Sequence, residues 1–179
     1  MKSSGGHQYG ELIVEPGFEA PDFTLKDEAG REVTFSTFRE GRFTVLVFIK
    51  GADDRHLYEL MDFLKDSYER IKFHNADVLV ISTGDAVFNK ALIMSRSLPF
   101  HILSDARLEA VKAYDIYHKP EVLTGPVMYI VSPGGLINFF YEGKNPDDIV
   151  EMADIIRMLH QLNEEDGSLV FGGSQDHTQ

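Results

Sequence analysis

The feature that most constrains the fold is an apolar run, Phe43-Thr-Val-Leu-Val-Phe-Ile49, which is rich in β-branched and aromatic residues. Such a run is typical of a strand that is covered on both faces. From about Arg55 to Lys72, apolar residues recur every three or four positions, which predicts an amphipathic helix. A second buried strand is expected from Asp77 to Ser82. The order strand, helix, strand predicts a sheet with helices on both of its faces.

Shorter patterns predict the other elements. Alternating apolar residues on either side of a turn at Asp27 to Gly30 predict a β-hairpin from Phe23 to Phe35. The last helix is expected to start at Pro146, because Asn145 is a favourable cap and proline fits the first helical position. The fold class is therefore α/β, a central mixed β-sheet flanked by helices with an N-terminal β-hairpin. The remaining expected elements are helices from near Asp85 and over 106–114, and strands over 101–103, 126–131 and 136–141.

The length of the chain indicates how many domains it has, and its charge excludes some classes of partner. Its 179 residues suit one domain over 13–162, with a flexible arm at 1–12 and a C-terminal tail at 163–179. A net charge of −12 argues against nucleic acid and anionic membranes as partners. No apolar run is long enough to span a bilayer, and the N-terminus lacks the apolar core of a secretory signal. A cytoplasmic location is therefore expected, and no motif indicates a cofactor.

Four motifs occur in an order that matches a known family. They are Gly17-Phe-Glu-Ala-Pro-Asp-Phe-Thr-Leu25, the strand residues Val45 to Phe48, Leu98-Pro-Phe-His-Ile-Leu-Ser-Asp105, and Gly125-Pro-Val-Met-Tyr-Ile-Val-Ser-Pro-Gly-Gly135. With them the chain resembles the peroxiredoxins and their thioredoxin-like relatives, the alkyl hydroperoxide reductase/thiol-specific antioxidant (redoxin) group. The resemblance implies a thioredoxin-like fold, a thiol-dependent peroxidase or antioxidant oxidoreductase activity, and a homodimer. It also makes Pro126 the candidate for the cis-proline of that fold.

The chain departs from this family at the positions that carry its chemistry, because it has no cysteine. Aligned without gaps, the active-site Pro, Thr and peroxidatic Cys of the peroxiredoxins fall at Lys50, Asp54 and Leu57. Aligned with a thioredoxin-type Cys-x-x-Cys loop, the two sulfurs fall at Asp53 and His56. A carboxylate lacks the nucleophilicity of a thiolate and its reversible sulfenic acid step, so the chain is predicted to be redox-inactive.

Two interpretations of the remaining loop residues stay open. In the first, Asp53 or Asp54 caps the following helix, and the protein is a binding or assembly module that engages a protein partner through this loop and the Pro126 face. In the second, the cluster Asp53/Asp54/His56 replaces the thiols, with Asp54 and His56 as metal ligands or acid–base groups. His101 lies between Phe100 and Ile102 and is expected to be a partly buried imidazole rather than a ligand.

Overall fold

The computed structural model describes residues 14–117 and 123–171. A seven-stranded mixed sheet forms its centre, with the strand order β2-β1-β5-β4-β3-β6-β7. The strands β3, β4 and β5 run parallel, whereas β1, β2, β6 and β7 extend the sheet through antiparallel pairs. The strands are β1 (Thr24–Lys26), β2 (Glu32–Thr34), β3 (Phe43–Ile49), β4 (Ala76–Ser82), β5 (His101–Ser104), β6 (Val127–Val131) and β7 (Ile137–Glu142).

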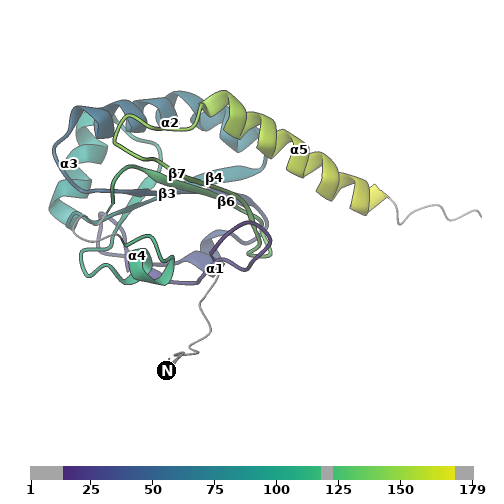
Figure 1. Ribbon diagram of the computed structural model, residues 1–179, viewed down its shortest axis with the longest axis horizontal. Coiled ribbons are helices and arrows are strands. Elements are labelled where there is room, and N and C mark those ends of the chain that lie inside the picture. Colours follow the sequence, from purple (N-terminus) through teal and green to yellow (C-terminus); the bar gives the residue numbers. More distant parts are fainter. Residues whose placement is uncertain (1–13, 118–122, 172–179) are drawn as a thin grey trace, which may run out of the picture.

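Helices cover both faces of this sheet (Figure 1). Residues of α2, α3 and α5 share one buried cluster, and residues of α1 and α4 share the other. Strand β3 contributes to both clusters because its successive side chains point to opposite faces of the sheet. Val45 and Val47 belong to the first cluster, and Leu46 and Phe48 belong to the second. The helices are α1 (Phe35–Phe38), α2 (Arg55–Phe73), α3 (Ala86–Arg96), α4 (Glu109–Ala113) and α5 (Met152–Phe171).

The predicted fold class is confirmed, and two helix starts are wrong. The helix expected over 106–114 is limited to α4, because Leu108 adopts a left-handed backbone at φ 59° and the Asp105 carboxylate accepts the N–H groups of Glu109 and Val111. That conformation places the start of the helix after Leu108. No helix in the described part of the chain is long and apolar enough to cross a membrane.

The last helix begins at Met152 and not at Pro146. The Asn145 side chain accepts the N–H of Asp147, and the Asp148 carboxylate accepts the N–H of Lys144. These bonds close a local turn, so Asn145 caps that turn and not a helix. Helix α5 then runs to Phe171, beyond the boundary at 162 expected for the domain, and its final turns project from the body (Figure 1).

Candidate functional site

The residues predicted for an active-site loop converge on a cavity of about 360 Å³. The cavity lies where β3 ends and α2 begins, and the chain around Pro126 and Pro146 forms its opposite wall. The structure thus brings together the two segments that sequence reasoning paired. Asp53 is the predicted loop residue that does not line the cavity. The lining residues are Ile49, Lys50, Ala52, Asp54, His56, Leu57, Leu60, Leu123, Thr124, Gly125, Pro126 and Pro146.

Both aspartates of the loop make local hydrogen bonds. Asp54 is the N-cap of α2, with an extended backbone, and its Oδ1 accepts the N–H of His56 at 3.0 Å. Asp53 accepts the hydroxyl of Tyr58, and this hydrogen bond raises the pKa of the Tyr58 phenol because it favours the protonated form. The capping interpretation of the sequence therefore describes Asp54 correctly.

His56 faces the opposite wall of the cavity. Its Nδ1 is buried and lies 2.5 Å from Oδ1 of Asp147. This contact is an ion pair only when the imidazole is protonated. Because the Asp147 side chain is 72% exposed, solvent screens the attraction. The His56–Asp147 contact connects the start of α2 with the turn that follows β7.

The position of the peroxidatic sulfur, as the ungapped alignment predicts it, is apolar and packed. Leu57 is only 7% exposed and belongs to the core cluster beneath α2, together with Leu60. Lys50, at the position predicted for the active-site proline, is exposed at the end of β3. The cavity is therefore a mainly hydrophobic recess with Lys50, Asp54, His56 and Thr124 among its lining residues.

The wall opposite α2 depends on a close approach between two backbone segments. A Cβ placed on Gly125 would lie 2.4 Å from the carbonyl oxygen of Asn145, which only glycine avoids. This contact holds Pro126, at the entry to β6, against the turn at 143–146 that also carries Pro146. Pro126 therefore lies in the cavity wall. Its assignment as the cis-proline of the fold stays a prediction.

The structure places three possible metal donors together outside this loop. Within the described residues, the group of carboxylate and imidazole side chains close enough to share one ion is Asp27, Glu28 and His101. Sequence reasoning missed it because His101 lies 73 residues from Glu28, so no spacing pattern connects them. Metal binding by Asp54 and His56 stays a prediction.

Comparisons with known proteins agree with the fold and the motifs. The AhpC/TSA family matches residues 16–140. The chain is 31% identical over 154 residues to peroxiredoxin Q, chloroplastic, of Oryza sativa subsp. japonica, covering 83% of this chain and 68% of that protein. It is 30% identical over 154 residues to the chloroplastic peroxiredoxin Q of Sedum lineare, covering 83% of this chain and 80% of that protein.

Solved structures of low sequence identity share the fold. Peroxidoxin BcpB from Mycobacterium tuberculosis superposes with a TM-score of 0.76 at 15% identity, over 83% of this chain and 98% of that one. The reduced 2-Cys peroxiredoxin of Plasmodium vivax gives a TM-score of 0.74 at 16% identity, over 86% of this chain and 99% of that one.

The relatives correct one expectation from the sequence. A cytoplasmic location is contradicted by the relatives found, because the peroxiredoxin Q proteins are named chloroplastic. The expectation rested on the missing apolar core of a secretory signal, and that observation addresses secretion alone. The family match over residues 16–140, the relatives and the shared thioredoxin-like fold lead to one conclusion: the chain is a cysteine-less member of the AhpC/TSA, or peroxiredoxin, family.

Proposed function

We propose that this protein does not reduce peroxides through a thiol and instead acts as a binding module built on the peroxiredoxin fold. One observation carries the proposal: the 179 residues contain no cysteine. A thiol peroxidase needs a sulfur that attacks one peroxide oxygen, expels the other and becomes a sulfenic acid. No other side chain in the loop offers this reversible step, and Leu57 offers no nucleophile.

The cavity supports binding as the retained role. It is a preformed recess of about 360 Å³ with hydrophobic walls and a small number of polar groups, which is the usual composition of a ligand site. The apolar walls supply affinity through burial, while Lys50 and Thr124 supply groups that can orient a ligand. The occupant can be a small molecule or a partner's side chain that enters between α2 and Pro126.

A peroxidase assay tests the first half of the proposal. The purified protein is incubated with hydrogen peroxide or an organic hydroperoxide, with dithiothreitol or thioredoxin as reductant. We expect turnover no greater than that of a heat-killed sample, because no group can form the sulfenic acid. Turnover above that control would contradict the proposal.

A matched pair of substitutions tests the second half. Ala52→Trp places a large side chain in the cavity wall, whereas Ala86→Trp places the same side chain at an exposed position at the start of α3. The probe is the fluorophore anilinonaphthalene sulfonate, which brightens in hydrophobic pockets. We expect the wild type and Ala86→Trp to bind it and Ala52→Trp to lose most of the signal. Equal binding by all three proteins would show that the cavity is not the site.

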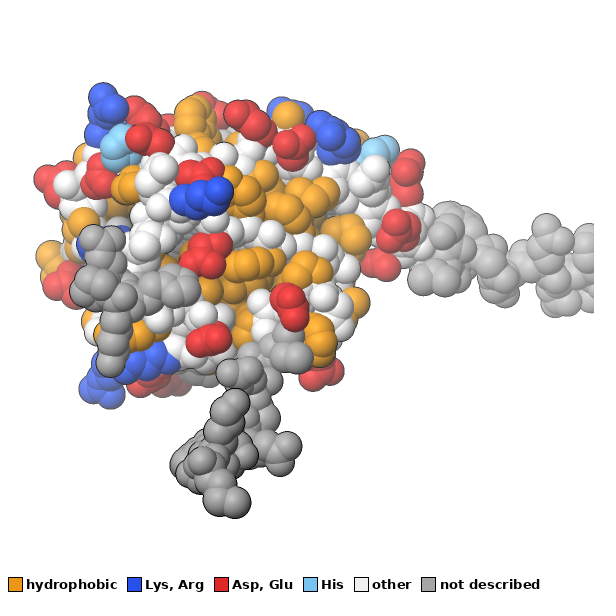
Figure 2. All heavy atoms as spheres, in the orientation of Figure 1, with side chains coloured by type: hydrophobic (Ala, Val, Ile, Leu, Met, Phe, Trp, Pro, Cys, Tyr) orange, Lys and Arg blue, Asp and Glu red, His pale blue; other side chains and the backbone are white. Residues whose placement is uncertain are grey.

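Association with a second copy is part of the same proposal. Strands β2 and β7 are the edges of the sheet, and unpaired edges are common places for subunits to meet. Hydrophobic side chains also gather across the middle of one face, beneath α5 and among acidic side chains (Figure 2). Surfaces of this kind support protein contacts. Analytical ultracentrifugation at micromolar concentration is expected to give twice the 20.2 kDa chain mass, and a monomer would contradict the dimer.

The enzymatic alternative has no specific observation in its favour. It requires Asp53, Asp54 and His56 to act together on one ligand. Asp54 accepts the N–H of His56 and Asp53 accepts the Tyr58 hydroxyl, and within the described residues the three side chains do not form a group close enough to share one ion.

A further inference from the structure

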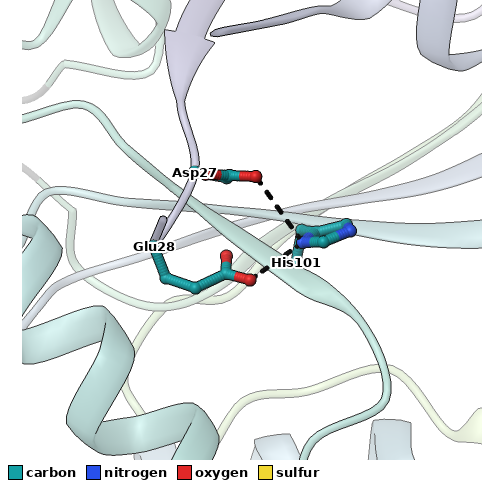
Figure 3. A group of neighbouring side chains, drawn as sticks. All are labelled: Asp27, Glu28 and His101. Carbon is teal, nitrogen blue, oxygen red and sulfur yellow. Dashed lines mark hydrogen bonds and ion pairs between the residues drawn. The ribbon is translucent and has the colours of Figure 1, made fainter. Parts of the chain in front are cut away.

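A cluster of donors lies where the turn between β1 and β2 meets the start of β5 (Figure 3). Asp27 and Glu28 follow β1 in the hairpin turn, and His101 is the first residue of β5. His101 pairs with Leu79 in the middle of β4, whereas the cavity adjoins the end of β3, and none of the three residues lines the cavity. This site is therefore independent of the proposed binding cavity.

The three side chains point toward one another. Nδ1 of His101 lies 3.0 Å from Oε1 of Glu28 and 4.0 Å from Oδ2 of Asp27. All three donor atoms lie within 4.8 Å of one another. A tetrahedral Zn²⁺ with ligand bonds of about 2.0–2.1 Å holds its donors roughly 3.3 Å apart. Adjustments within the reach of side-chain rotation would bring the three donors to that spacing.

The surroundings hold one carboxylate in place. The Asp27 side chain is 2% exposed and accepts the N–H groups of Ala29 and Arg31, each at 2.9 Å. The Asp27 carboxylate is thus a donor held in a fixed position by its hydrogen bonds.

The second carboxylate, that of Glu28, has one oxygen without a hydrogen-bond partner among the described residues. The Glu28 side chain is 18% exposed, and its Oε2 is buried with no hydrogen-bond partner within the described residues. A buried carboxylate oxygen without a partner costs free energy, because it has lost its water without a replacement. His101 is 46% exposed, so water and ions reach the cluster from its side. The unpartnered oxygen and the open side together point to a bound cation.

We propose that Asp27, Glu28 and His101 form a binding site for a divalent transition metal, with Zn²⁺ as the best match. One imidazole and two carboxylates are ligands that Zn²⁺ accepts, and three protein ligands leave a fourth position for water. The Arg31 guanidinium, 3.0 Å from Oδ2 of Asp27, competes for that oxygen. This competition limits the affinity and favours Glu28 and His101 as the principal ligands.

The test is a ZnCl₂ titration of the full, tag-free, metal-stripped chain by isothermal titration calorimetry at pH 7.5. We expect one Zn²⁺ per chain at this site and a Zn²⁺-dependent rise in Tm, since a ligand that binds only the folded state stabilises it. His101→Ala is expected to weaken binding at least about tenfold, the scale of losing one ligand's contribution. The His101 side chain is exposed, and the Tm of the variant without Zn²⁺ shows directly whether it is folded.

The matched control is His160→Ala. His160 lies on α5 with its ring 5.5 Å from that of His74, so this pair is another place in the described part of the chain where Zn²⁺ could meet imidazoles. Unchanged Zn²⁺ affinity in His160→Ala and weakened affinity in Glu28→Gln would support the proposal. It would be overturned by the absence of stoichiometric binding in the wild type, or by equal affinity of the wild type and His101→Ala. In that case the Glu28–His101 contact is only a structural hydrogen bond.

Discussion

The start of α2 and the turn that meets β5 both concentrate polar side chains, yet they use them differently. At α2, Asp53 and Asp54 bind groups within five residues of themselves. At the turn, Asp27 also makes local bonds, but Glu28 reaches His101, 73 residues away. The first region was the expected place for chemistry and the second was not.

The difference shows that polar groups close together in sequence satisfy one another's hydrogen bonds. A carboxylate beside the start of a helix accepts the unpaired N–H groups of the first turn. Its hydrogen-bonding capacity is therefore used by the helix itself and not by a ligand. Donors from distant segments are assembled by the sheet, and their spacing follows from strand pairing and not from local hydrogen bonding. A buried polar atom without a hydrogen-bond partner, such as Oε2 of Glu28, is therefore a better indicator of a ligand site than a run of polar residues in the sequence.

The largest expected effect is a difference in stability when one aspartate of each region is replaced by alanine. Asp27→Ala is expected to lower the free energy of unfolding by about 3 kcal/mol, because it removes three hydrogen bonds to a buried carboxylate. Asp54→Ala is expected to cost only about 1 kcal/mol, the usual value of a helix cap. Urea unfolding at pH 7 measures both. Equal losses would erase the contrast between the two regions.

Acid titration sharpens the contrast between Asp27 and a second buried carboxyl, Asp105. The pKa of Asp27 is lowered, so its stabilisation is complete above the ordinary carboxyl value of about 3.9 and is lost as the pH falls through the lowered value. Burial raises the pKa of Asp105, so its contribution has the opposite sign and is lost as the pH rises through the raised value.

Unfolding free energies between pH 2.5 and 7 distinguish these two groups. Asp27→Asn is expected to make the loss of stability in acid shallower than in the wild type. Asp105→Asn is expected to make it steeper, because it removes a contribution that grows in acid. Parallel curves for the two variants would contradict the assignment.

The accessibility of the cavity wall is tested by adding single cysteines. Leu57→Cys puts a thiol in the apolar wall, and Asp53→Cys puts one at an exposed position. Burial raises a thiol pKa, and each unit lowers the thiolate fraction tenfold, so we expect Leu57→Cys to react at least about tenfold more slowly with dithionitrobenzoate. The absorbance of the released thiolate follows both reactions. Faster reaction of Leu57→Cys would indicate a site that still activates sulfur.

The smallest expected effect concerns His56. Because its partner Asp147 is exposed, His56→Ala is expected to change the free energy of unfolding by less than about 1 kcal/mol. Asp147→Asn serves as the matched variant and should give a change of the same size at pH 6. A loss of several kcal/mol from either variant would show that the His56–Asp147 contact is important for stability, in contradiction to this prediction.

Much of the fold was predictable because its signals are local. The apolar run of β3 and the three-to-four periodicity of α2 follow from side-chain burial, which repeats with the period of each element. The start of α5 was not predictable, since Asn145 is equally suited to cap a helix or to close a turn. Tertiary packing decided between them: Ile149 and Val150 pack against the core outside any helix.

The sequence by itself determined the family, the order of the elements, the absence of a thiol and the capping of α2 by an aspartate, since these depend on local patterns and on composition. Only the tertiary structure decided that His56 meets Asp147 and that His101 meets Glu28. The physical reason is that contacts between distant segments depend on strand order and on the direction of each side chain. Neither quantity is encoded in the spacing of residues along the chain.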